Sequence, residues 1–82
     1  MKDKEVTRVI FRTFENGEVI ALFPELDEGS GLCASYVHVG QHGAANYSYV
    51  IRKTIPATPR KYRELLAELK SIGYNLRVYR RS

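Results

Sequence analysis

The alternation of apolar and polar positions predicts β-strands along the first half of the chain. Residues 6–14 are rich in β-branched and aromatic side chains, which favour strands. Asn16 and Gly17 follow. Both residue types tolerate positive φ, so the pair predicts a two-residue type I′ turn into a second strand, residues 18–25. Because Glu15 would then face Glu18 with like charge, a longer loop is the alternative.

The two-residue turn sets the register of this hairpin and therefore its two faces. It pairs Phe14 with Val19 and Phe11 with Leu22. One face then carries Phe11, Thr13, Ile20 and Leu22, and the other carries Ile10, Phe14, Val19 and Phe23. Both faces are apolar, and a short chain with one clear helix is not expected to cover both from within. We therefore predict self-association through one of them, in the simplest case as a homodimer.

The middle of the chain predicts a loop, a strand and a short helix. Residues 25–31 form an acidic, glycine-containing loop, and residues 32–39 a third strand. In that strand Leu32, Ala34, Tyr36 and His38 point one way, and Cys33, Ser35, Val37 and Val39 the other. Residues 40–43 are expected to turn the chain. Residues 46–53 have apolar side chains at helical spacing, although their β-branched members leave a strand as the alternative.

The clearest helix covers residues 60–72. Its apolar stripe consists of Tyr62, Leu65, Leu66, Leu69 and Ile72, the spacing of a helix with one buried side. Thr58 can cap its start and Pro59 suits its first position. Gly73 can end it in a left-handed conformation. A last strand, residues 74–80, follows.

These elements predict one α+β domain over residues 1–82, with residues 1–5 frayed. The sheet is expected to be mainly antiparallel, with about four strands in the order β-β-β-α-β and the 60–72 helix packed on one face. If strand directions alternate, the last strand runs parallel to the first and beside it.

The composition of the chain indicates its cellular compartment and its net charge. The 82 residues carry a formal charge of +4 and a single cysteine. No apolar run approaches the length of a membrane span, and the lone cysteine fits a reducing compartment. We therefore expect a cytoplasmic protein that does not enter a membrane. Acidic residues gather early in the chain and basic ones late, which marks either a binding face or solvated charge.

Four segments taken together carry a resemblance to known sequences: residues 21–25 (ALFPE), 38–45 (HVGQHGAA), 56–59 (PATP) and 71–76 (SIGYNL). They resemble a group of short uncharacterised bacterial proteins, some carried by phages or other mobile elements. The resemblance spans about residues 9–78. It implies an accessory protein of a bacterium or its mobile DNA, and it implies no activity, cofactor or catalytic residue.

Metal binding and nucleophilic catalysis are weakly supported. His38 and His42 are four apart, but the glycines around them argue against a helix that would bring the two rings together. With Cys33 they make three ligands, fewer than the four of a structural zinc site. Cys33 lies in mid-strand among apolar neighbours and is expected to be a buried small hydrophobe. We predict no metal, no cofactor and no enzymatic activity.

Residues 36–47 hold both histidines of the chain. We expect Tyr36, His38, Gln41, His42 and Tyr47 to lie close together as a candidate binding cluster whose first role is structural. In that role, amide and imidazole groups satisfy backbone groups that a glycine turn leaves unpaired. Asn46 or Ser48 is expected to cap the helical turn carrying Tyr47. An exposed His42 in a concave pocket would instead make this loop a functional site.

Arginines that alternate with a tyrosine suggest a surface for nucleic acid. Arg77, Tyr79 and Arg81 would share one face of the last strand, and Arg8 and Arg12 one face of the first. Such side chains bind phosphates and stack on bases, although positive charge also protects an edge strand. Our first hypothesis is a non-catalytic binding or adaptor protein that contacts a protein partner or itself. The alternative is a basic nucleic-acid-binding accessory protein.

Overall fold

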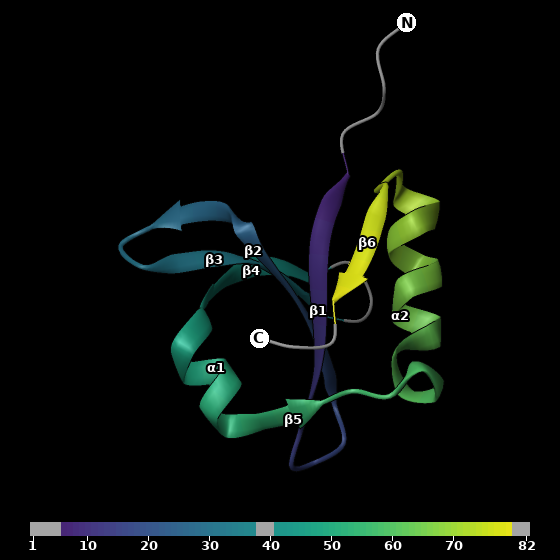
Figure 1. Ribbon diagram of the computed structural model, residues 1–82, viewed down its shortest axis with the longest axis horizontal. Helices are drawn as coiled ribbons and strands as arrows, with labels where there is room; N and C mark the ends of the chain where they lie inside the picture. The colour runs from purple at the N-terminus through teal and green to yellow at the C-terminus, as the bar shows by residue number, and fades with distance from the viewer. Residues whose placement is uncertain (1–5, 38–40, 80–82) are drawn as a thin grey trace, which may run out of the picture.

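The computed structural model describes residues 6–37 and 41–79 (Figure 1). The elements are β1 (Thr7–Phe14), β2 (Val19–Gly29), β3 (Leu32–Val37), β4 (Gln41–Asn46), α1 (Tyr47–Lys53), β5 (Thr54–Pro56), α2 (Pro59–Ile72) and β6 (Leu76–Tyr79). The expected α+β class and mainly antiparallel sheet are confirmed. The short helix predicted over residues 46–53 is confirmed as α1. The expected count of about four strands with one packed helix is too low, because this part of the chain forms six strands and two helices.

The sheet is built around β1. Its strand order is β4-β3-β2-β1-β5, and β6 also pairs with β1. One edge of β1 pairs with β2. The other edge is shared: β6 pairs in parallel with residues 7–10, and β5 pairs antiparallel with residues 12–14. The parallel placement of the last strand beside the first is therefore confirmed.

The two strands that the sequence analysis missed have weak patterns. β5 has only three residues and ends in a proline, which cannot donate a ladder hydrogen bond. β4 contains glycine and two alanines, which are poor strand formers. Pairing with β1 and β3 stabilises both strands. The predicted turn over residues 40–43 is therefore wrong for residues 41–43, which belong to β4, and residue 40 lies outside the described residues.

The β1–β2 loop has three residues instead of two. The Phe14 N–H donates to the Glu18 carbonyl, and the Gly17 N–H donates to the Phe14 carbonyl, both at 2.8 Å. Gly17 has φ +94°, whereas Asn16 has a negative φ. The type I′ turn is therefore wrong, and the geometry is that of a three-residue loop with glycine in the left-handed position. The longer loop keeps Glu15 from facing Glu18 directly.

This extra residue shifts the strand register by one. Phe11 lies opposite Ala21 and Ile10 opposite Leu22. Since side chains alternate along a strand, every side chain of β2 moves to the face opposite the predicted one. Phe11 now shares its face with Phe23, and Ile20 and Leu22 lie on the other face.

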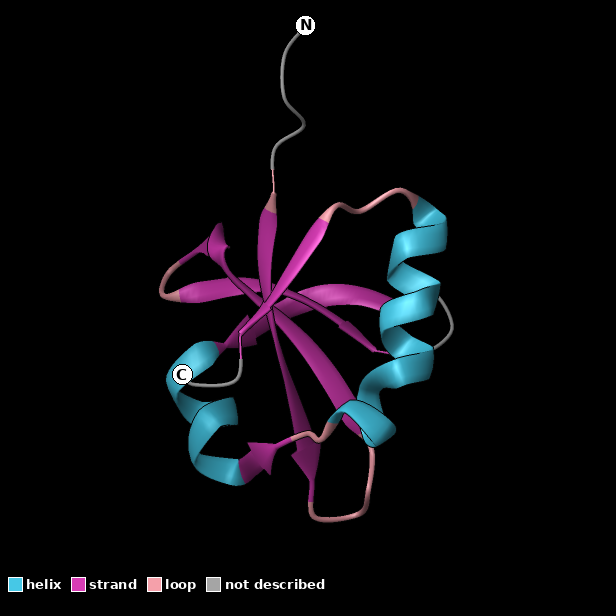
Figure 2. Ribbon diagram, turned by 45° about the vertical axis from the view of Figure 1, so that its right-hand side comes forward, coloured by secondary structure: helices cyan, strands magenta, loops and turns pink. Residues whose placement is uncertain are grey.

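Both faces of the sheet are covered from within the chain (Figures 1 and 2). On one face a core forms between the strands and α2, from Val9, Phe11, Ala21, Phe23, Tyr36, Ala57, Leu65 and Leu69. On the other, α1 contributes Val50, which packs against Ile20, Leu22 and Cys33. The expectation that one apolar face stays uncovered is wrong, because α1 supplies the second cover. The premise for self-association through the hairpin is thereby lost.

Helix α2 follows the predicted capping pattern. The Thr58 hydroxyl accepts from the Lys61 N–H, and Pro59 opens the helix. At its end, Gly73 has φ +120°, and the Tyr74 N–H donates to the Leu69 carbonyl, as in a Schellman motif. Within the helix Leu69 is 0% exposed, whereas Ile72 is 50% exposed.

Aromatic stacking anchors both ends of this helix. Near its start, Tyr62 stacks on Phe11 with ring centres 4.4 Å apart. Just beyond its end, Tyr74 stacks on Phe23 at 5.3 Å. After the turn at Gly73, Tyr74 therefore continues the packing in place of Ile72.

Beyond Phe23, β2 continues as an exposed arm with β3. The pairing shifts register between Phe23 and Asp27 and again before Gly29. All of residues 24–31 are exposed, and Figure 1 shows the hairpin extending away from the helices. The predicted acidic loop is therefore mostly strand, since β2 extends to Gly29. Neither helix of the described part is long and apolar enough to cross a membrane.

We predict that Leu69→Ala lowers the free energy of unfolding by about 2–5 kcal/mol, through lost burial and a cavity. Ile72→Ala is the matched control on the same helix, and it should have a much smaller effect because half of Ile72 is exposed. Urea denaturation measures both. Equal shifts of the two midpoints would contradict the packing described for α2.

We predict that Gly17→Ala destabilises the protein by about 1–2 kcal/mol, because an L-residue is strained at positive φ. Gly43→Ala is the control: Gly43 is not in that region, and an added Cβ would make an ordinary 3.7 Å contact with the Ser35 hydroxyl. Thermal unfolding of the two variants should separate them. A Gly17→Ala protein as stable as Gly43→Ala would show that the turn relaxes.

Candidate functional site

A histidine and two tyrosines form a cluster on the α2 side of the sheet. Tyr36 and His42 are cross-strand partners, and their rings meet edge to face with centres 4.6 Å apart. The Tyr74 hydroxyl lies 3.3 Å from His42 Nε2. Tyr36 is buried, and its hydroxyl donates to the Glu68 carboxylate on α2. The cluster thus ties β4 and β3 to the helix layer.

The five residues expected to form one cluster separate in the structure. Tyr36 and His42 are together, but Tyr47 packs into the core under α1, on the opposite face. The chain passes to that face where α1 begins. The predicted cap of this helix is confirmed, because the Asn46 side chain accepts from the Tyr49 N–H at 2.9 Å. His38 lies outside the described residues. Gln41 pairs through its backbone with Val37.

His42 fits neither of the two expectations completely. It is exposed, so it is not a buried donor that ties down a turn. It also does not line the pocket around Ile55 or the one around Arg60. It lies on β4 with a hydrogen-bonding distance to Tyr74, as part of an exposed aromatic contact.

Cys33 is buried among apolar side chains. It is 4% exposed and packs with Ile20, Leu22 and Val50. Burial raises the pKa of its thiol, and the carboxylate of Glu28 adds to the rise, while a backbone hydrogen bond with Phe23 opposes it. A reactive thiolate needs the opposite environment. Within residues 6–37 and 41–79, no three His, Cys, Asp or Glu side chains are grouped as a metal site would need.

Arg12 is a buried cation with a structural role. It is 6% exposed. Its Nε donates to the Thr54 hydroxyl at 2.9 Å, and a terminal nitrogen donates to the carbonyls of Thr54 and Ile51 at 2.7 and 3.0 Å. Burial lowers the pKa of its guanidinium from the ordinary value. These contacts place positive charge at the carbonyl end of α1, where the helix dipole favours it. Arg12 is therefore not available for the expected contact with nucleic acid.

The other predicted arginines and the tyrosine meet on the sheet. The parallel register places Arg8 beside Arg77 and Ile10 beside Tyr79. The guanidinium carbon of Arg8 lies 4.9 Å from the centre of the Tyr79 ring. Arg8 and Arg77 are exposed, and Arg8 also forms an exposed ion pair with Glu25 at 3.4 Å. We call Arg8, Arg77 and Tyr79 the arginine–tyrosine face. Arg81 lies outside the described residues.

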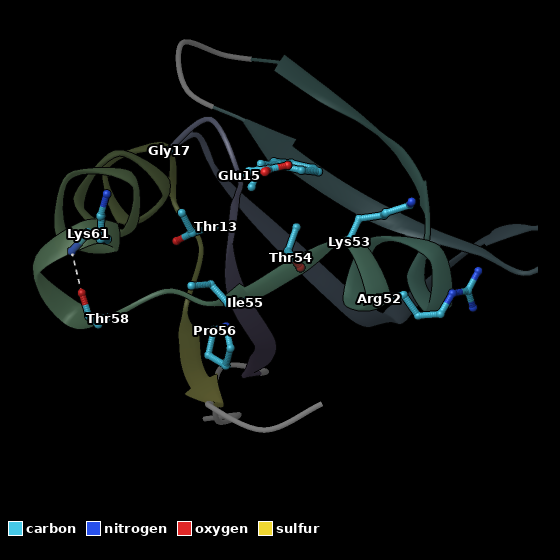
Figure 3. A pocket seen from close by; sticks show the side chains of 11 residues that line it. Thr13, Glu15, Gly17, Arg52, Lys53, Thr54, Ile55, Pro56, Thr58 and Lys61 are labelled. Atoms are coloured by element: carbon cyan, nitrogen blue, oxygen red, sulfur yellow. Dashed lines mark hydrogen bonds between the residues drawn. The ribbon is translucent and has the colours of Figure 1, made fainter.

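A pocket that the sequence analysis did not anticipate lies at the other end of β1 (Figure 3). Its volume is about 550 Å³. It is formed where the β1–β2 loop, the end of α1, β5 and the start of α2 come together. The lining residues are Thr13, Phe14, Glu15, Gly17, Arg52, Lys53, Thr54, Ile55, Pro56, Thr58 and Lys61. These segments are separated in the sequence, so only the cluster of basic residues within 52–63 hinted at the site.

We predict that Cys33 makes the protein less stable in alkaline solution. Because the folded thiol has a raised pKa, the unfolded chain loses its proton first, so stability falls as pH rises above the ordinary thiol value of 9.0. Cys33→Ala should lose this part of the pH dependence. Urea denaturation below and above that pH measures the free energy of unfolding of both proteins. If this free energy changes with pH by the same amount in the unaltered protein and in Cys33→Ala, the assignment is contradicted.

The chain was also compared with known proteins. No family model matches it, no curated protein matches it, and no solved structure matches it. Its function must therefore be argued from its own residues.

Proposed function

We propose that the protein is a non-enzymatic binding protein for single-stranded nucleic acid, and that the arginine–tyrosine face is the contact surface. The observation that carries the proposal is the position of the Arg8 guanidinium over the Tyr79 ring, with its carbon 4.9 Å from the ring centre, beside the exposed Arg77. Two sequence-distant strands supply these side chains. The proposal thus rests on their assembly on one surface.

The chemistry of this face suits bases and phosphates. Unstacked bases stack on aromatic rings and on guanidinium planes. The Arg8 guanidinium carbon lies over the Tyr79 ring, so a base that reaches this face meets both groups. Arg77 beside it can contact a phosphate oxygen. The pair with Glu25 does not prevent this, because exposed ion pairs are worth only about 0–1 kcal/mol.

Further positive charge lies on the same side of the sheet. α1 covers that side, and its last turn carries Arg52 and Lys53, both exposed. Within the described part of the chain, the pair of Arg8 and Glu25 is the one ion pair found. Arg52, Lys53 and Arg77 are therefore not neutralised by salt bridges to described carboxylates. Such charges attract a polyanion over several ångströms of solution.

A protein-binding adaptor is the second candidate, and the edge of β4 favours it. β4 lies at the end of the sheet order and pairs only with β3 within the described residues. Its sequence, QHGAAN, contains no charged residue and no proline, which are the usual protection of an edge strand. A partner could therefore add a strand there through backbone hydrogen bonds. Such binding would depend little on salt.

We predict that the full chain binds a fluorescently labelled single-stranded oligonucleotide and that affinity falls as salt rises, because counterions are released from the phosphates. Arg8→Lys keeps the charge and removes the guanidinium plane, so it should weaken binding by about 1–3 kcal/mol, the range for loss of base stacking. Fluorescence anisotropy measures both effects.

Two comparisons make this test specific. Lys70→Gln removes a charge from the last turn of α2 and should change affinity little. Tyr79→Ala should weaken binding as Arg8→Lys does. Absence of salt-dependent binding would refute the proposed function. Binding that survives Arg8→Lys and Tyr79→Ala unchanged would show that the arginine–tyrosine face is not the contact surface.

A further inference from the structure

We propose that the pocket between β5 and the start of α2 is a second, separate binding site, for the phosphate group of a small phosphate monoester. It lies at the far end of β1 from the arginine–tyrosine face. Thr13 belongs to the α2 side of the sheet, as Phe11 does, whereas Arg8 and Tyr79 lie on the α1 side. Both sites draw on the charge of Arg52 and Lys53, whereas Thr13 and Lys61 belong to this pocket alone.

The charge of the lining favours an anion. Three cations line the pocket, Arg52, Lys53 and Lys61, against one carboxylate, Glu15. Lys53 also lies 5.7 Å from the centre of the Tyr49 ring. Figure 3 shows Lys61 on one side of the pocket and Arg52 and Lys53 on the other. The cationic ends of Arg52 and Lys53 point away from Thr13 and Ile55 there, so their charge would attract an anion through solution and not by direct contact.

The start of α2 adds a second source of positive potential. This helix has 14 residues and no acidic residue in its first turn. Thr58, its cap, and Lys61 both line the pocket. Pro59 has no N–H, and the N–H groups of Lys61 and Tyr62 already donate to Thr58. The contribution of the helix start is therefore its aligned peptide dipoles, which favour negative charge nearby.

The independent sign of a ligand is Thr13. The residue is 7% exposed, and its hydroxyl oxygen is the one buried side-chain polar atom that has no hydrogen-bond partner within the described residues. A buried hydroxyl without a partner is costly. Figure 3 shows Thr13 between Ile55 on β5 and the cap of α2, among the residues that line the pocket. The hydroxyl oxygen is covered by its neighbours, so a ligand oxygen that entered there would accept from it once the Thr13 side chain turned.

The dimensions indicate the kind of ligand. A volume of about 550 Å³ lies within the range of pockets that hold small organic molecules. Inorganic phosphate would occupy only part of this space. Ile55 and Pro56 on β5 and Phe14 on β1 provide apolar lining for the rest of a ligand. We therefore assign the phosphate to the Lys61 and Thr13 end and an organic moiety to the apolar wall.

The test is an amide NMR titration of the full chain with inorganic phosphate, AMP and adenosine at constant ionic strength. We expect saturable shifts at the amides of Thr13, Gly17 and residues 58–62 with AMP, weaker ones with phosphate, and none with adenosine. Equal binding of AMP and adenosine would refute a phosphate site. Shifts that do not saturate, or that occur equally at the arginine–tyrosine face, would refute a distinct pocket.

Three charge variants assign the site. Lys61→Gln should weaken AMP binding about tenfold or more, the loss of one charge-assisted contact. Glu15→Gln should strengthen it by removing the opposing charge. Lys70→Gln makes the same change as Lys61→Gln at the other end of α2 and should have no effect. Equal effects of Lys61→Gln and Lys70→Gln would overturn the site.

Thr13→Val separates a ligand contact from a purely structural role. It removes the unpaired hydroxyl at nearly constant shape, so the ligand-free protein should be as stable as before or more stable. AMP binding should nevertheless weaken. Unchanged AMP affinity would show that the hydroxyl does not face the ligand. Arg8→Lys should leave AMP binding unchanged, so failure of this site and failure of the nucleic-acid proposal are distinguishable.

Discussion

Hydrogen bonding along both edges of β1 is the constraint on which the rest of the structure depends. One edge belongs to β2 along residues 10–13. The other is divided between β6, which is parallel, and β5, which is antiparallel. A buried strand must satisfy its backbone groups on both sides. The chain therefore has to return twice to the same edge, and these two returns carry α1 and α2 to opposite faces of the sheet.

The buried Arg12 secures the first of these returns. Its guanidinium bonds to the Thr54 hydroxyl and to the carbonyls of Thr54 and Ile51, which joins β1, β5 and the end of α1. The two candidate sites follow from this arrangement. β6 brings Tyr79 to Arg8 on one face, while β5 brings the end of α1 beside the start of α2 at the opposite end of β1. Both sites gather positive charge on surfaces that the core leaves open.

Much of the fold could be predicted from short-range patterns. The residues that begin and end α2, namely Thr58, Pro59 and Gly73, act through local backbone geometry and behave as predicted. The side-chain alternation of β3 is likewise local, with Tyr36 facing one core and Cys33 the other. The β1–β2 register was not predictable in this way. A loop longer by one residue relieves a like-charge contact, and that small difference moves every side chain of β2 to the other face.

The candidate sites show the same division. By itself, the sequence determined that Arg8, Arg77 and Tyr79 are residues able to bind phosphates and bases, and that cations cluster in residues 52–63. Only the tertiary structure decided that Arg12 is withdrawn into the core and that Tyr47 lies on the face opposite Tyr36. It also decided that Thr13 faces a basic pocket. The physical reason is that contacts between distant segments depend on which strands share an edge of β1, and local propensity does not encode that choice.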